Sequence, residues 1–137
     1  MIVVDTGPLV ALLDAGDRHH RRCRDWLSRT EVPLIVPVPV VTETCYFIER
    51  AGRPEIEAEF LASFDTGKRF QMVDLGADDW MRVRALVLDY ADLPLGVVDA
   101  SVVAVAERLG TPEIASLDHR HFTVVRPSHI SSLTLLP

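Results

Sequence analysis

The sequence lacks any apolar run close to the ~18 residues that a membrane-spanning helix needs, and no segment resembles a signal peptide. Its two cysteines, Cys23 and Cys45, do not form a C-x-x-C pair. In the absence of an export signal, we interpret them as reduced thiols. We therefore expect a soluble cytoplasmic protein that makes no contact with a membrane.

Basic residues are also in short supply, because 14 lysines and arginines face 20 aspartates and glutamates, for a net charge of −6. This balance argues against a nucleic-acid partner bound through a broad basic surface. It does not exclude such a partner if some of the carboxylates hold a divalent metal ion, since the ion inverts the local charge.

Familiar catalytic motifs are missing as well. The sequence contains neither a G-x-x-x-x-G-K-[ST] nor a G-x-G-x-x-G phosphate-binding loop. No Ser-His-Asp or Cys-His arrangement stands out.

The sequence does contain a regular alternation of short apolar runs and helical segments, in a chain of 137 residues with 48% hydrophobic residues. We predict strands over Ile2–Val4, Leu34–Val36, Phe70–Val73 and Thr123–Val125, and another that begins at Glu113. We predict helices over Leu9–Leu13, Arg18–Ser28, Val40–Arg50, Pro54–Phe64, Ala77–Tyr90 and Val97–Gly110. This order indicates one α/β domain, residues 1–137, with a parallel sheet.

One helical stripe, formed by Trp80, Val83, Val87 and Tyr90, has the spacing of a buried helix face. We expect these side chains to belong to the core and to have no chemical role.

Asp5 directly follows the continuous apolar run Ile2–Val4, which is typical of a strand buried on both faces. Open α/β sheets bind ligands at the carboxyl ends of their strands. The alternative is that Asp5 only caps the helix that follows. Asp118 repeats this arrangement after the strand that begins at Glu113.

Asp99 is the only charged residue between Asp92 and Glu107, in a segment that is apolar nearly all round. A lone carboxylate in such surroundings is costly unless it is paired, hydrogen-bonded or metal-bound. Glu43 also lies among apolar neighbours, at the start of a predicted helix. Its structural alternative is a favourable interaction with the helix dipole.

If these four carboxylates converge, their mutual repulsion calls for a hard divalent cation. Oxygen-only ligation selects Mg²⁺ or Mn²⁺ rather than zinc. Water bound to such an ion has a lowered pKa and can attack a phosphodiester.

Arginines crowd the segment from Arg18 to Arg24, together with His19 and His20. A solvated helix face explains this pattern, and the functional alternative is a phosphate-contacting patch beside Asp5. The adjacent histidines point to different sides of a helix and do not form a metal-binding pair.

The carboxylates lie within four short motifs whose order and spacing resemble the PIN-domain family, and more closely its VapC toxins of bacterial toxin–antitoxin pairs. The motifs are Asp5-Thr6-Gly7, Val41-Thr42-Glu43, Val98-Asp99-Ala100-Ser101 and Ile114–Phe122. The resemblance covers essentially the whole chain. It implies a three-layer fold in which helices flank a central, mainly parallel sheet.

The same resemblance implies an endoribonuclease toxin that depends on Mg²⁺ or Mn²⁺, cleaves RNA with a metal-activated water and is inhibited by a cognate antitoxin. It further implies a homodimer. The implied metal ligands and catalytic residues are Asp5, Glu43, Asp99 and Asp118, and Thr6 and Ser116 would line the site with hydroxyl groups.

Two departures from the family pattern bear on this comparison. Ser116 stands where such sequences often carry threonine, which keeps the hydroxyl group. Leu95 and Gly96 stand where many members carry a further acid, so a fifth ligand is not expected. A catalytically silent RNA- or protein-binding module is the alternative function. A haloacid-dehalogenase-type phosphatase is excluded, because it needs an aspartate where this chain has Gly7.

Overall fold

The computed structural model describes residues 1–137, which form five strands and seven helices. The strands are β1 (Ile2–Val4), β2 (Leu34–Pro37), β3 (Phe70–Val73), β4 (Glu113–Ala115) and β5 (Thr134–Leu136). The helices are α1 (Thr6–Leu13), α2 (His20–Arg29), α3 (Val38–Arg50), α4 (Pro54–Ala62), α5 (Ala77–Asp89), α6 (Val97–Leu109) and α7 (His119–Val124).

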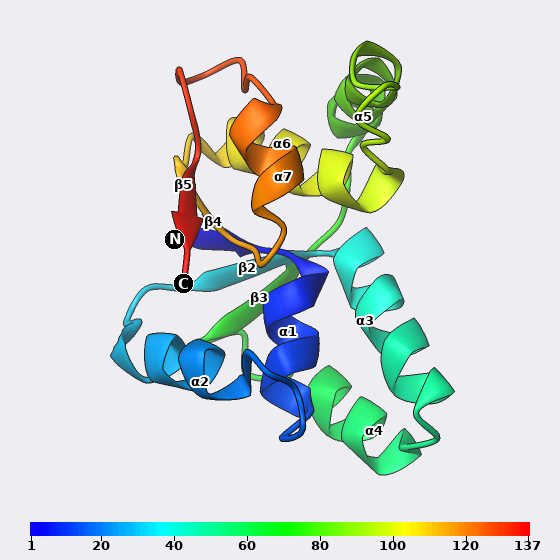
Figure 1. Ribbon diagram of the computed structural model, residues 1–137, viewed down its shortest axis with the longest axis vertical. Coiled ribbons are helices and arrows are strands. Elements are labelled where there is room, and N and C mark those ends of the chain that lie inside the picture. The colour runs from blue at the N-terminus through cyan, green and yellow to red at the C-terminus, as the bar shows by residue number, and fades with distance from the viewer.

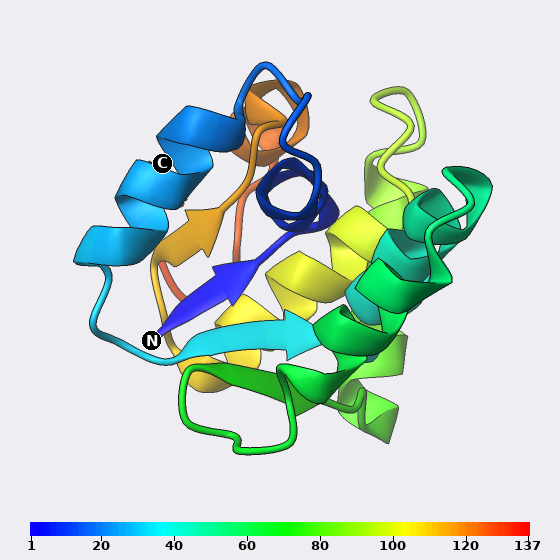
Figure 2. The ribbon, with the colours of Figure 1, turned by 90° about the horizontal axis from the view of Figure 1, so that it is seen from below.

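The strands form one parallel sheet in the order β3-β2-β1-β4-β5. β1 is the central strand, and its Val3 is in register with Ile35 of β2 and Ile114 of β4. Because all pairs are parallel, the carboxyl ends of the strands meet at one edge of the sheet (Figure 2). Asp5 and Ser116 follow two neighbouring strands at that edge.

Helices cover both faces of the sheet, so the predicted three-layer α/β fold with a parallel sheet is confirmed (Figure 1). α6 contacts β1, β2 and β4, and α1, α2 and α4 lie on the other side. No helix has the length and hydrophobicity required to span a bilayer.

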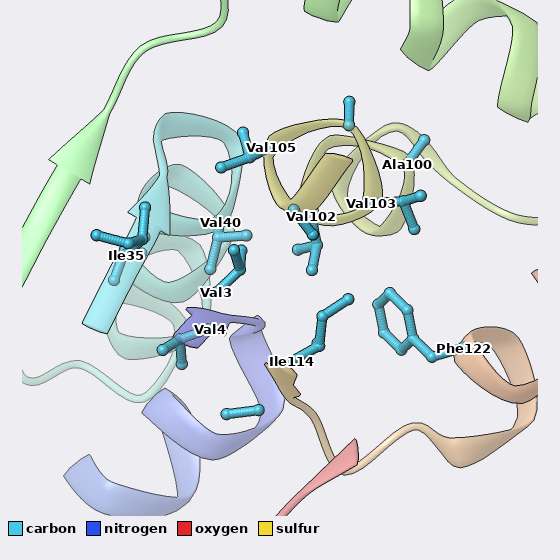
Figure 3. Close-up of a cluster of buried hydrophobic side chains, with 14 of the residues drawn as sticks. Val3, Val4, Ile35, Val40, Ala100, Val102, Val103, Val105, Ile114 and Phe122 are labelled. Carbon is cyan, nitrogen blue, oxygen red and sulfur yellow. The ribbon is translucent and has the colours of Figure 1, made fainter. Parts of the chain in front are cut away.

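The core lies mainly between α6 and the sheet, where Val102 and Val105 face Val3 and Ile114 (Figure 3). Seven successive residues of α6, from Ala100 to Ala106, are buried. Small side chains among them permit the close approach of the helix. The helix ends at Gly110, whose φ of 64° favours glycine. The central helix predicted for this segment is confirmed.

The strand predicted over Thr123–Val125 is wrong, because Thr123 and Val124 end helix α7 and the last strand lies at Thr134–Leu136. The carboxylate of Asp118 accepts hydrogen bonds from the amides of Arg120 and His121 and so caps this helix. Thr123 and Val124 therefore adopt helical rather than extended backbone, despite their strand propensity, because they follow this capped helix start.

The core assignment of the α5 stripe is only partly right. Val83 is buried, but Trp80 is 49% exposed and Val87 is also exposed. The buried face of α5 is shifted, because Val83 and Leu86 point inward one turn apart. Other predicted helix boundaries differ by a few residues, and the starts of α1 and α3 matter for the site.

Candidate active site

Asp5 lies where β1 ends and α1 begins, and only 5% of it is exposed. One carboxylate oxygen accepts a hydrogen bond from the backbone amide of Thr6 (2.7 Å). The other accepts one from the hydroxyl of Ser116 (2.7 Å), which follows the neighbouring strand β4. Asp5 is therefore both the N-cap of α1 and a buried carboxylate that is held from two strand ends.

Burial raises the pKa of Asp5 from 3.8 to about 6. The Ser116 hydrogen bond opposes this rise, and the nearby charges of Asp99 and Glu43 add to it. The carboxylate has no cationic partner among the ion pairs of the structure. Its ionised form is therefore poorly compensated at neutral pH.

Glu43 reaches Asp5's neighbourhood from α3. Its carboxylate accepts a hydrogen bond from the hydroxyl of Thr6 (2.6 Å), which joins α3 to the start of α1. Because α3 begins at Val38, two residues earlier than predicted, Glu43 lies beyond the first turn. The helix-dipole interpretation, which requires a residue in the first turn, is therefore wrong.

Asp99 lies in the first turn of α6, and its side chain is 21% exposed. Desolvation raises its pKa, and the charges of Asp118 and Glu43 act in the same direction. The imidazole of His121 lowers it, both by charge and by a hydrogen bond.

His121 is the one site residue that the sequence did not single out. Its Nδ1 lies 2.8 Å from Oδ2 of Asp99 and 3.2 Å from Oδ2 of Asp118. Asp118 is the N-cap of α7 and His121 lies three residues later in that helix, which is the spacing of helix neighbours. Had residues 119–124 been predicted as a helix, this spacing would have indicated the contact.

The structure thus links the six predicted site residues into two adjacent groups. In the first group Thr6 holds Glu43 and Ser116 holds Asp5. In the second, Asp99 and Asp118 share the imidazole of His121. The backbone amide of Asp118 donates to the hydroxyl of Ser116 (3.0 Å), which connects the second group to the first.

The donor chemistry of these groups suits a hard cation, because the donors are carboxylates that repel one another and lack a lysine or arginine partner. As they stand, however, no three histidine, cysteine, aspartate or glutamate side chains are close enough together to hold a metal ion.

Replacing His121 by alanine should raise the pKa of Asp99 above its wild-type value. The substitution removes the group that favours the ionised carboxylate, while the charges of Asp118 and Glu43, which disfavour it, remain. Carbon-detected NMR titration of the metal-free protein measures this shift. His119→Ala is the matched control, since His119 is exposed and does not contact the acidic residues. An unchanged Asp99 pKa in His121→Ala would contradict the role assigned to His121.

The arginine-rich segment does not lie beside Asp5, as its functional alternative required. Arg18 and Arg22 instead line a groove that also includes Ile2, at the opposite end of β1. The two histidines are engaged separately. The ring of His19 accepts a hydrogen bond from Arg18 (2.9 Å), and Nδ1 of His20 lies 2.7 Å from the carbonyl oxygen of Ala11.

Known proteins are similar to this chain in sequence and in fold. The chain is 29% identical to Ribonuclease VapC26 of Mycobacterium tuberculosis over 137 residues, which cover 99% of this chain and 100% of that protein. The crystal structure of Mycobacterium tuberculosis VapC20, a toxin that cleaves the sarcin–ricin loop, superposes with a TM-score of 0.83. It covers 96% of this chain and 99% of VapC20 at 19% identity.

A toxin–antitoxin complex from Klebsiella pneumoniae contains a similar fold, with a TM-score of 0.70, 19% identity, and coverage of 95% of this chain and 100% of that chain. The family model of the PIN domain matches residues 2–126. The four carboxylates and both supporting hydroxyl groups lie within that match. The chain therefore belongs to the PIN-domain family.

Proposed function

We propose that this chain, as one nuclease domain of residues 1–137, is an endoribonuclease toxin of the VapC type that depends on a divalent metal. The observation that carries the proposal is Asp5, a buried carboxylate without a cation at the carboxyl end of the central strand, next to the charges of Asp99 and Glu43. Similarity over the full length to a protein named a ribonuclease supports the choice of RNA as substrate.

The residues that would hold Mg²⁺ or Mn²⁺ are Asp5, Glu43, Asp99 and Asp118. The bound cation would neutralise these carboxylates and supply the Lewis acidity that phosphodiester hydrolysis requires.

The chain's own residues prepare this site through hydrogen bonds. Ser116 fixes one oxygen of Asp5, while the amide of Asp118 donates to the Ser116 hydroxyl (3.0 Å) and orients it. Thr6 fixes Glu43 in the same way. These contacts limit the rotation of the carboxylates, so less conformational freedom is lost when the site is filled.

The alternative is a catalytically silent module that binds RNA or protein. Purified protein incubated with tRNA, rRNA and mRNA in Mg²⁺, Mn²⁺ or EDTA distinguishes the two functions. Discrete cuts that require metal support the nuclease, and binding without cuts supports the silent module. If the protein neither cleaves nor binds any of these RNAs, both functions are refuted.

We also propose a homodimer that a cognate antitoxin inhibits in the cytoplasm. The similar fold within a toxin–antitoxin complex supports the antitoxin. Large apolar side chains stay exposed on two helices, with Tyr46 and Phe47 on α3 and Trp80 and Leu88 on α5. Such surfaces are typical of protein interfaces.

Light scattering of the purified protein should therefore give twice the mass of the 15.3 kDa chain. Replacing exposed Leu88 by glutamate should shift the protein toward the monomer if the α5 surface forms part of the interface. A monomer of the wild type at micromolar concentration would contradict the dimer.

A further inference from the structure

A groove of about 910 Å³ lies between α2 and the sheet, and the proposed chemistry does not use it. Four arginines line it, Arg18, Arg21, Arg22 and Arg29. A second hollow of about 390 Å³ adjoins it and adds Arg24, while sharing Arg21. All five arginines are exposed.

The positive charge of the chain is concentrated in the α2 segment beside this groove, whose own lining holds four arginines and three carboxylates. Residues 18–29 contain five arginines and one aspartate, so the segment carries a net charge of +4. Because the whole chain carries −6, the remaining residues carry −10. The excess of acid in the composition therefore conceals a compact basic surface on one helix.

These arginines are not neutralised by the acids around them. The ion pairs of the chain involve Arg82, Arg108 and His121, and none includes an arginine of residues 18–29. Arg18 donates to His19, and Arg22 donates to the main-chain oxygen of Pro137. The carboxylates that line the same groove, those of Asp25, Glu31 and Glu113, form no ion pair with them.

Like charges one helical turn apart, such as Arg21 and Arg24, destabilise an unliganded helix. Guanidinium groups bind phosphate through paired N–H donors. Trp26 lines the same groove and packs in part against the core, and a base can stack only on the part of its side chain that faces the groove. Arginines interspersed with an aromatic ring are the composition of a site for single-stranded nucleic acid.

The groove and the acidic site lie at opposite ends of one strand. Ile2 lines the groove, and Asp5 follows the last residue of β1. A strand rises about 3.3 Å per residue, so the two ends are about 10 Å apart. An RNA chain of a few nucleotides is longer than this distance.

We propose that the α2 groove binds the sugar–phosphate backbone of single-stranded RNA and anchors a substrate whose cleaved bond lies at the acidic site. The inference rests on the proposed ribonuclease function. The anchor contacts phosphates and one base face rather than base edges, so it adds affinity with little sequence selectivity.

Fluorescence polarisation with a labelled single-stranded RNA tests the groove in EDTA, where binding is measured without cleavage. The test variant is Arg21→Gln/Arg24→Gln/Arg29→Gln. The control, Arg53→Gln/Lys68→Gln/Arg84→Gln, removes the same charge from exposed positions elsewhere. The test variant should bind at least about tenfold more weakly than wild type, and the slope of log affinity against log salt should fall by about 2.

Equal losses in the two variants would overturn the proposal, because they would reflect net charge alone. Wild-type RNA affinity in the test variant would also overturn it, and a concurrent loss of antitoxin binding would assign the groove to an acidic protein partner. Thermal melts and the single variant Arg24→Gln guard against a misfolded triple variant, since Arg24→Gln should show part of the same loss.

Cleavage assays separate this inference from the proposed function. With metal, the test variant should cleave a dinucleotide as wild type does, because that substrate is too short to reach the groove, and should show a raised KM for long RNA. If wild type cleaves no RNA, the proposed nuclease fails, whereas the EDTA binding result still decides the groove. If wild type cleaves and the KM for long RNA is unchanged, the anchor fails.

Discussion

Asp99→Asn should abolish RNA cleavage while the protein stays folded. The amide keeps the volume of the side chain and can still bond to His121, but it removes the charge that attracts a cation. Asp99 stands alone on an otherwise apolar helix start and keeps a raised pKa despite His121. Loss of several kcal/mol of transition-state stabilisation corresponds to a rate decrease on the order of a thousandfold.

The matched control is Asp92→Asn, which removes an exposed carboxylate shortly before the same helix. It should cleave RNA at the wild-type rate. Circular dichroism and thermal melts would show that both variants are folded. Near-wild-type cleavage by folded Asp99→Asn would remove Asp99 from the site.

The sequence predicted correctly those elements whose residue pattern fits only one type of secondary structure. The run Ile2–Val4 has no polar residue that could face water on either side of a strand, so it predicts a strand buried on both faces in the centre of the sheet. The valines of α6 were ambiguous by β-propensity alone. The small residues Ala100 and Ala104 and the final Gly110 decided for a helix, which the structure contains.

The errors arose where tertiary structure overrides local preference. Thr123 and Val124 have strand propensity but follow the helix cap of Asp118. Trp80 has the spacing of a core residue yet lies on the outer face of α5, because the inward direction is set by Val83 and Leu86. Spacing along a helix defines its faces, but only packing against α6 decides which face is buried.

The carboxylates could be located from the sequence, whereas their partners could not. The contact of Thr6 with Glu43 joins residues 37 positions apart, and Ser116 lies 111 positions from Asp5. Such pairs depend on the order of the strands in the sheet, which cannot be predicted from a single sequence. His121 was missed for a simpler reason. Thr123–Val125 was predicted as a strand and no helix was predicted before it, so the three-residue spacing from Asp118 did not indicate a contact.

Asp5→Asn should raise the melting temperature of the metal-free protein at neutral pH. Burial holds the pKa of Asp5 at about 6 rather than 3.8, so the ionised carboxylate destabilises the fold by about 3 kcal/mol. An amide resembles the protonated carboxyl group and carries no such penalty. For a domain of this size, the gain corresponds to roughly 10 °C.

The pH dependence of stability gives an independent check. Below pH 3.8 Asp5 is protonated in both states, so it makes no difference to stability. As the pH rises from 3.8 to about 6, the unfolded chain loses its proton while the folded chain keeps it, and folding becomes less favourable. The penalty is complete above about pH 6. The difference in melting temperature between Asp5→Asn and the wild type should therefore shrink as the pH falls from about 6 to 3.8.

Metal should narrow the difference in stability between the two proteins. Mn²⁺ at a hundred times its dissociation constant should stabilise the wild type by about 2.7 kcal/mol, and Asp5→Asn should gain less. If Asp5 acted only as the cap of α1, its replacement would instead cost about 1 kcal/mol with or without metal. Asp65→Asn, at an exposed position, should leave both melts unchanged. Melts in EDTA and across a Mn²⁺ titration decide the sign. A lower melting temperature for Asp5→Asn in EDTA, with a wild type that ignores Mn²⁺, would mean that the four carboxylates do not share one site.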